Sequence, residues 1–414
     1  MIQLVIEMSQ SLTIHIGSHK TGSTSIQNAL MVNRSRLREN GIHFFCEDPN
    51  GKKLLHGNSS SWIKFRDDDV LRADVVPGLA QRLGKYGRHV VISTEMFSWI
   101  FAKESLKKLK INLSFFFNDI KIITYLRRQD RQIISHFQES SKSSNLPATR
   151  FFGKKTCKAM PQYQPHLALY YDYFERLSLW ADVFGCDSIA IRIFEKPQLK
   201  DEDVVSDFFD LLGVPYNSKV VRLNERTGFR LTKLNHLMNQ SGTRRYFRNI
   251  IASSIKDDSY LLPAKKEAFS FYSKFRESNR NLNNKFKINN REFLFDEDFS
   301  LYPKRPLDEW NETTANRAIL ELLEAFENVP LSKNTEIDLI RDAAIKMEIL
   351  DRDMAENLMQ IAARLRPEGE GIKRKLYGYE QLRNFDKRST LARIKSRCIW
   401  TYQFLKSFIN SGMG

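Results

Sequence analysis

Short apolar runs, each bounded by polar residues, recur through the first half of the chain. Four of these runs predict β-strands: Leu12–Ile16, His89–Ile92, Ile120–Leu126 and Ser188–Ile193. Apolar runs of this length are typical of strands that are buried on both faces of a parallel sheet. Helix-like stretches lie between them: Ser25–Glu39, Val75–Leu83 and Tyr170–Val183. Strands that alternate with helices predict an α/β fold, in which helices cover both faces of a parallel sheet.

The pattern becomes helical in the second half of the chain. Three apolar residues are spaced for one helix face there: Leu234, Leu237 and Met238. The prolines that begin at Pro303 mark a break, after which the composition is helical and increasingly basic. We therefore expect an α/β domain over residues 11–303 and an all-helical C-terminal extension over residues 304–414.

Small residues in the C-terminal region are spaced so that two helices can pack closely. Ala355, Met359, Ala362 and Pro367 match the second helix of a tetratricopeptide-type repeat. The preceding segment would supply the partner face, with Ala343, Ala344 and Met347. A plain antiparallel helix pair would show the same residues, and a single unit needs something else to pack against. Both interpretations stay open.

The end of the chain is basic and then aromatic. Nine lysines and arginines come first: Lys373, Arg374, Lys375, Arg383, Lys387, Arg388, Arg393, Lys395 and Arg397. The aromatic stretch begins at Trp400. Such a tail could lie on the anionic inner face of a membrane, as a peripheral contact. A solvated helix that docks by its apolar side explains the same residues.

Composition narrows the class of protein. The 414 residues are 42% hydrophobic and 28% charged, which fits a folded chain, and the net charge of +16 favours polyanionic partners. No nucleic-acid-binding module is apparent in the sequence. The four cysteines form no CxxC pair, which points to a reducing compartment rather than to disulfides or zinc: Cys46, Cys157, Cys186 and Cys398. With no signal peptide or membrane span in the pattern, we expect a cytoplasmic protein.

A glycine- and hydroxyl-rich loop follows the first strand: Gly17, Ser18, His19, Lys20, Thr21, Gly22, Ser23, Thr24 and Ser25. The glycines are spaced as in a Walker A loop, but the lysine lies two residues before the second glycine. Backbone N–H groups of such a loop, together with the start of the next helix, can hold a phosphate. The hydroxyls of Thr21, Ser23, Thr24 and Ser25 can donate further hydrogen bonds. An ordinary polar turn is the alternative.

A second candidate anion site follows the third strand. Arg127 stands at the strand end, and Ser135 lies eight residues later on the expected helix. The planar guanidinium group suits phosphate. Because Arg128 and Arg131 lie nearby, either could serve in place of Arg127. An ion pair or a solvated helix start is the alternative for a lone cluster of this kind.

Glu95 follows the second strand and is a candidate general base. It could equally be the first residue of a helix, with Ser93 or Thr94 as the cap. Three histidines compete for the role of base: His19, His56 and His136. Of these, His19 adjoins Lys20, so supporting the donor is the alternative role for it.

The run from His15 to Gln27 resembles the 5′-phosphosulfate loop of sulfotransferases that use 3′-phosphoadenosine 5′-phosphosulfate (PAPS), especially their bacterial branch. The resemblance implies that Lys20 contacts the bridging oxygen of the donor, and that Arg127 and Ser135 bind its 3′-phosphate. It implies a 5′-phosphosulfate site built from the loop: Ser18, Lys20, Thr21, Gly22, Ser23, Thr24 and Ser25. The parallel sheet would then be of the P-loop NTPase type, and no metal would be required.

Further segments resemble the same family: Tyr171–Phe174, Trp180–Gly185, Ile191–Glu195, Arg222–Gly228 and Phe275–Arg280. In the fourth of these, Asn224 would contact the nucleotide, although the usual Asn-Glu-Ser is Asn-Glu-Arg here. The resemblance spans roughly residues 11–303. It implies a sulfuryl acceptor with a hydroxyl group, a carbohydrate or lipid-linked sugar.

Two other functions compete with sulfuryl transfer. A small-molecule kinase of the P-loop class would need magnesium and a carboxylate to hold it, for which Glu95 is the candidate. A basic protein that binds acidic glycans without catalysis would explain the net charge alone. Neither alternative accounts for two anion sites at successive strand ends.

Overall fold

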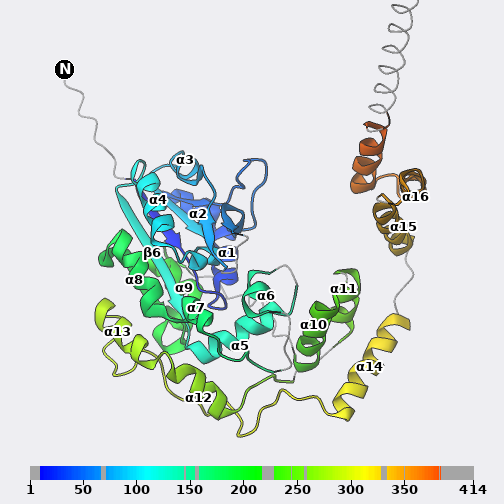
Figure 1. The fold of residues 1–414 in the computed structure, drawn as a ribbon. Coiled ribbons are helices and arrows are strands. Elements are labelled where there is room, and N and C mark those ends of the chain that lie inside the picture. The colour runs from blue at the N-terminus through cyan, green and yellow to red at the C-terminus, as the bar shows by residue number, and fades with distance from the viewer. Residues whose placement is uncertain are drawn as a thin grey trace, which may run out of the picture. The chain divides into compact units, whose positions relative to one another are not determined.

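The structure is a computed structural model of the chain (Figure 1). It describes residues 10–66, 71–143, 146–153, 158–216, 228–243, 245–255, 259–327, 333–348, 350–381 and 383. The chain divides into two compact units, residues 1–325 and 326–414. Each unit is described separately below.

The first unit contains a five-stranded parallel sheet with the strand order β2-β5-β1-β6-β7. Its strands are β1 (Ser11–His15), β2 (Ile42–Phe45), β5 (His89–Ser93), β6 (Asp119–Leu126) and β7 (Ile189–Ile193). The four predicted strands and their parallel arrangement are confirmed. The strand β2 was not predicted. A second, two-stranded antiparallel sheet pairs β3 (Ile63–Phe65) with β4 (Ala73–Val75).

Alternate side chains of the strands enter two separate cores, one on each face of the sheet. On one face, Val90 and Ile122 pack with helices α3 (Leu79–Leu83), α4 (Lys103–Ser114) and α8 (Tyr173–Phe184). On the other face, Val91 and Ile123 pack with α1 (Ser23–Val32), α2 (Arg34–Glu39) and α9 (Val204–Leu211). Burial on both faces explains why the strands are continuously apolar.

Further helices complete the first unit: α5 (Gln129–Ser140), α6 (Pro147–Phe152), α7 (Ala168–Tyr171), α10 (Phe229–Ser241), α11 (Arg245–Ser254), α12 (Lys265–Ser273), α13 (Arg276–Phe286) and α14 (Glu312–Glu327). The break predicted at Pro303 lies in the long connection between α13 and α14. Figure 1 shows α12 and α13 next to each other along the lower edge of this unit. Among the described residues, no helix is both long and apolar enough to cross a bilayer.

Several predicted helices are shorter than expected. The stretch predicted as one helix from residue 25 to 39 breaks at Asn33, between α1 and α2. The helix predicted from Val75 is wrong at its start, because Val75 pairs with Ile63 in the small sheet and α3 begins only after Gly78. The helix predicted from Tyr170 is divided by Asp172, whose side chain accepts the Glu175 N–H and so starts α8.

In α10, Leu234 and Met238 are buried as predicted, whereas Leu237 is exposed. The buried pair packs with Ile251 of α11 and Ala318 of α14 in a small separate core. Leu237 lies at the flank of this buried face, so the predicted apolar face is narrower than its sequence spacing indicated.

The second unit contains α15 (Lys333–Met347), α16 (Arg352–Leu365) and a further helical segment over residues 370–381. Ala344 packs with Ala355, Met359 and Ala362, and these four side chains are fully buried. Ala343 is exposed instead. The antiparallel-pair and tetratricopeptide interpretations both remain predictions. The aromatic end of the tail lies outside the described residues, as does the basic part from Lys387 onward.

Candidate functional site

The three segments that carry the candidate chemistry meet at one edge of the sheet. Strand β1 lies between β5 and β6, with His15 opposite Ser93 on one side and Ile123 on the other. The chain continues the pairing just beyond the strand, where Thr94 donates its N–H to the His15 carbonyl at 3.1 Å. The carboxyl ends of central parallel strands are where α/β folds bind ligands.

The loop after β1 depends on its two glycines. Gly17 has φ 64°, and a Cβ added there would lie 2.8 Å from the Glu95 Cβ. Gly22 has φ 82°, and an added Cβ would lie 2.7 Å from Val204 Cγ1. Any other residue would be strained in its backbone and would clash. The loop therefore has one shape, pressed against the segment after β5 and against α9.

Lys20 lies at the apex of this loop and also adopts a left-handed backbone, with φ 65°. Non-glycine residues in this region are uncommon and concentrate at functional sites. Its ammonium group lies 3.1 Å from the Glu139 carboxylate of α5. The lysine thus points from the loop toward α5.

The hydroxyl groups of the loop serve mainly to shape it. Thr21 is fully buried and donates to the Ser18 carbonyl at 2.7 Å, and Ser23 approaches the same carbonyl at 3.5 Å. The Ser18 hydroxyl accepts a hydrogen bond from Arg176 at 2.8 Å. The Thr24 side chain is exposed, and that of Ser25 is partly exposed. The helix α1 starts at Ser23 without a side-chain cap, which leaves its first N–H groups for another acceptor.

His19 is held on several sides. Its backbone N–H donates to the Tyr170 hydroxyl at 2.9 Å, and that hydroxyl lies 2.7 Å from its Nδ1. The ring stacks on His136, with 4.6 Å between the centroids, and its carbonyl accepts from Gln132 at 2.9 Å. Burial lowers the pKa of His19 to about 4, although Glu95 and Glu139 oppose the shift. The imidazole is therefore neutral near pH 7.

Arg127 reaches the same loop from the end of β6. Its Nη1 lies 3.4 Å from the Lys20 carbonyl, and its own carbonyl accepts the Tyr173 hydroxyl at 2.7 Å. Burial lowers the pKa of Arg127, and the positive charge of Arg131 lowers it further. The Nε–H of Arg131 is buried and has no hydrogen-bond partner within the described part of the chain. Because these two guanidinium groups repel each other, an anion bound between them would be stabilised by both charges.

Arg128 has a different environment from its neighbours. It is buried and forms a two-pronged ion pair with Asp130, at 2.7 and 3.0 Å. It also donates to the carbonyls of Asp296 and Asp298 and stacks on the Phe299 ring. Of the three arginines in the sequence cluster, Arg128 is committed to the packing of the segment after α13. Arg127 and Arg131 remain for a ligand.

Glu95 is the first residue of a short 3₁₀ helix, Glu95–Trp99, which Thr94 caps by accepting the Met96 N–H. Its carboxylate is also half-buried against the loop. It accepts a hydrogen bond from Gln27 at 3.0 Å and from Asn58 at 3.1 and 3.2 Å. The helix-start interpretation is therefore correct in its local geometry, and it coexists with a carboxylate that is held by two amide groups beside the loop.

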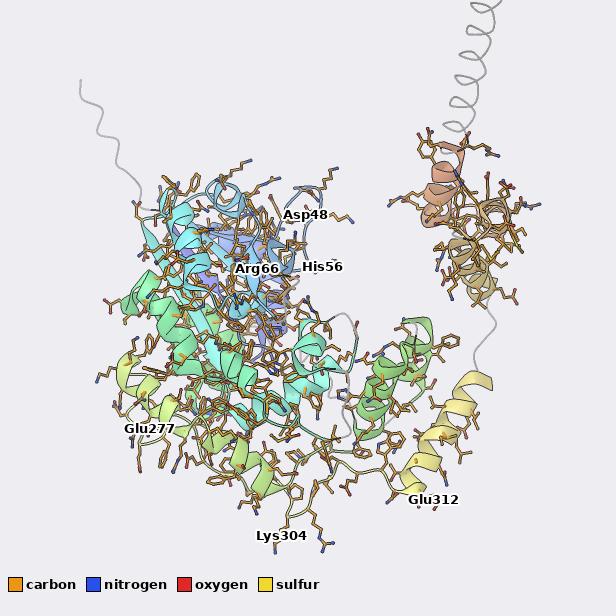
Figure 2. All side chains as sticks on the ribbon, in the orientation of Figure 1. Asp48, His56, Arg66, Glu277, Lys304 and Glu312 are labelled. Carbon is orange, nitrogen blue, oxygen red and sulfur yellow. The ribbon has the colours of Figure 1, made fainter. Side chains whose placement is uncertain are left out.

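Of the other two candidate histidines, one lies beneath the site and one lies away from it. His136 is buried within α5, where its Nδ1 lies 3.0 Å from the Tyr171 hydroxyl, and burial lowers its pKa well below the usual range. His56 is exposed on the loop between β2 and β3 (Figure 2). Asn224 lies outside the described residues. Among those that are described, no group of three or more His, Cys, Asp or Glu side chains is arranged to hold a metal ion.

Four residues of the site were not predicted: Gln27, Asn58, Glu139 and Arg176. Glu139 lies four residues after Ser135 on α5, so helical spacing could have indicated it. Asn58 and Arg176 come from distant segments, and no local pattern marks them.

No family model matches the chain. An uncharacterized protein from Archaeoglobus fulgidus is 26% identical over 247 residues, a match that covers 56% of this chain and 63% of that protein. The crystal structure of a sulfotransferase from Alicyclobacillus acidocaldarius is 14% identical, with a TM-score of 0.36 over 67% of this chain and 96% of that one. A structural similarity at this level establishes neither the fold nor the activity.

Proposed function

We propose that this protein transfers a sulfuryl group from PAPS to a hydroxyl group of a carbohydrate or a lipid-linked sugar. One observation carries the proposal: Arg127 Nη1 lies 3.4 Å from the backbone carbonyl of Lys20. The two candidate anion sites are therefore adjacent, as one doubly phosphorylated nucleotide would require. If Lys20 and Arg127 lay in separate cavities, a single donor molecule could not contact both.

Under this proposal, the loop and the uncapped start of α1 bind the 5′-phosphosulfate. Arg127, Arg131 and Ser135 bind the 3′-phosphate, which distinguishes PAPS from ATP. The acceptor oxygen attacks sulfur while the bond from sulfur to the 5′-phosphate oxygen breaks, and adenosine 3′,5′-bisphosphate leaves. Lys20 stabilises the charge that develops on the leaving oxygen. Positioning and electrostatics supply most of the catalysis in transfers of this kind.

Glu95 is the group we assign as general base. Its two amide partners orient the carboxylate without neutralising it, so it can accept the proton of the acceptor hydroxyl. His19 is less suited to this role. If the Tyr170 hydroxyl donates to Nδ1, the ring proton is on Nε2, and the neutral ring has no free lone pair for a second proton. We assign His19 a supporting role in holding the loop.

The acceptor class rests on the net charge of +16, which favours an acidic glycan, and on the resemblance of the sequence. Incubation with sulfate-labelled PAPS and a panel of glycans, lipid-linked sugars and small hydroxyl compounds would identify the acceptor. Label in a glycan fraction is the expected result.

Replacing the lysine tests the assignment of the donor site. We expect Lys20→Ala to lower transfer by at least a hundredfold, since it removes the cation at the leaving oxygen. Stability should change little, because the Lys20 side chain is part-exposed and its ion pair is worth at most about 1 kcal/mol. The measurements are transfer of labelled sulfate and thermal unfolding. Full turnover by K20A would refute the role of Lys20, and thermal stabilisation of the wild-type protein by Mg-ATP but not by adenosine 3′,5′-bisphosphate would refute the function.

A further inference from the structure

Helix α5 presents a single exposed stripe. Most of its residues are buried, and the part-exposed ones recur every fourth position: Arg131, Ser135 and Glu139. The Glu139 end of the stripe lies beside the loop after β1, because Glu139 contacts Lys20, and the buried Gln132 of the same helix donates to the His19 carbonyl. Arg131 is cationic and Ser135 is neutral, and both suit an anion site. The third is a carboxylate, which anion binding does not explain.

The Glu139 carboxylate is shared between two lysines. Its Oε2 lies 3.1 Å from the Lys20 ammonium group and 2.9 Å from that of Lys142. The three side chains are 26–42% exposed, so the cluster is only partly screened by water. Burial raises the pKa of Glu139, but the charges of Lys20 and Lys142 outweigh this effect and lower it overall. The carboxylate is ionised at neutral pH.

We infer that Glu139 is an internal counter-ion, which holds Lys20 in the absence of donor and is exchanged for the phosphosulfate when the donor binds. The inference rests on the proposed function. An ammonium group paired with a carboxylate is unavailable to a ligand anion, and the carboxylate itself repels that anion. Lys20 must therefore leave Glu139 before it can contact the leaving oxygen.

Lys142 makes this exchange feasible. When Lys20 turns to the donor, Glu139 keeps the second ammonium group, so the carboxylate is not left without a counter-ion. A part-buried charge that loses its last partner would oppose the exchange much more strongly. Lys142 thus favours donor binding through Glu139, without contacting the donor.

The same contacts argue against Glu139 as the catalytic base. Two lysines stabilise its charged form, which makes the carboxylate a weak proton acceptor. Within the described part of the chain, the hydrogen bonds to the Glu95 carboxylate come from neutral amide groups. The two roles predict opposite results for one substitution.

Calorimetric titration with adenosine 3′,5′-bisphosphate tests the inference in four full-length proteins: wild type, E139Q, K142M and the double variant. For E139Q we expect about two- to fivefold tighter binding, the size of one part-exposed ion pair. For K142M we expect weaker binding by a similar factor, because Glu139 then holds Lys20 more tightly. In the double variant the K142M effect should disappear. Glu104→Gln, which removes a carboxylate from an exposed pair with Lys107 on α4, is the matched control and should leave affinity unchanged.

Three results would overturn the inference. Weaker or unchanged binding by E139Q would show that Glu139 does not compete with the donor. Weaker binding by K142M in the E139Q background would show that Lys142 acts on the donor directly. A hundredfold loss of turnover in E139Q with unchanged affinity would identify Glu139 as the base. If the wild-type protein itself binds no bisphosphate, the proposed function fails first, and this inference fails with it.

Discussion

At the scale of single residues, the site combines a strained backbone with side chains that are already held. Lys20 keeps a left-handed conformation between two glycines, at a cost of about 1 kcal/mol that the surrounding contacts must offset. Glu95 is fixed by Gln27 and Asn58 before any ligand arrives. Groups held in place in advance need little reorganisation during a reaction.

Asn58 gives a test of Glu95 that separates positioning from catalysis. We expect Glu95→Gln to lower the kcat of transfer by about a hundredfold or more, since it removes the base and keeps the shape. Asn58→Ala should lower kcat by a smaller factor, about tenfold, because the carboxylate remains but loses a partner. Neither substitution should change the affinity for adenosine 3′,5′-bisphosphate. Steady-state kinetics and calorimetry make the measurements, and full activity of E95Q would leave Glu95 as a helix-start residue only.

At the scale of elements, α5 is held in the fold at its start and carries residues that we propose bind the donor. Its start is held in the protein by the buried ion pair of Arg128 with Asp130, which Tyr302 joins through a hydrogen bond at 2.6 Å. Its part-exposed stripe consists of Arg131, Ser135 and Glu139, and Glu139 contacts Lys20 of the loop after β1. Neighbouring arginines of one helix start therefore have different environments, because Arg128 is buried in an ion pair and Arg131 is partly exposed.

Two substitutions at the start of α5 should change different properties. One should lower the stability of the fold, and the other should lower the affinity for the nucleotide. Arg128→Gln leaves Asp130 buried without its counter-ion, and we expect the free energy of unfolding to fall by about 3–5 kcal/mol. Arg131→Gln removes a part-exposed guanidinium group, so the unfolding free energy should change by less than about 0.5 kcal/mol. The affinity of R131Q for adenosine 3′,5′-bisphosphate should fall about tenfold, as for the loss of one charged hydrogen bond to phosphate.

Urea unfolding and calorimetry measure the two quantities for each variant. The two variants are controls for each other, since they make the same chemical change three positions apart. A stable R128Q protein with weak nucleotide binding would reverse the assignment of the two arginines.

At the scale of the whole molecule, several histidines are buried in their neutral form. Burial lowers the pKa of His15 and of His236 to about 4, and both side chains are almost fully inaccessible. In the unfolded chain each would titrate near 6.5. Between those two values the unfolded state binds more protons than the folded state, so acid favours unfolding.

We therefore expect the contribution of these histidines to stability to be constant between pH 7 and 8 and to fall as the pH decreases from about 6.5 to 4. At pH 5 each fully buried histidine should contribute a loss of about 1–2 kcal/mol. Urea unfolding between pH 4.5 and 8 measures this dependence. A variant with both His15 and His236 replaced by Gln should show a shallower slope than the wild-type protein. An equal slope would show that other groups, such as carboxylates, govern the acid response.

Much of the architecture follows from local patterns. The four predicted strands are present because a continuous apolar run can be buried on both faces only inside a covered sheet. The strand β2 was missed, since its four residues include His43 and become a strand only by pairing with β5. The start of α3 was misplaced, because Val75 pairs with Ile63, a contact that no helical periodicity reveals.

What the sequence determined by itself is four of the five strands of the parallel sheet, the glycine loop after the first strand and the cationic positions that follow the third predicted strand. These features depend on the backbone conformation and on the pattern of apolar residues, which residues close together in the sequence determine. Only the tertiary structure decided which arginine is buried, which amides hold Glu95 and that Glu139 faces Lys20. Such pairings join residues as far apart as 119 positions, and burial and charge act through space rather than along the sequence.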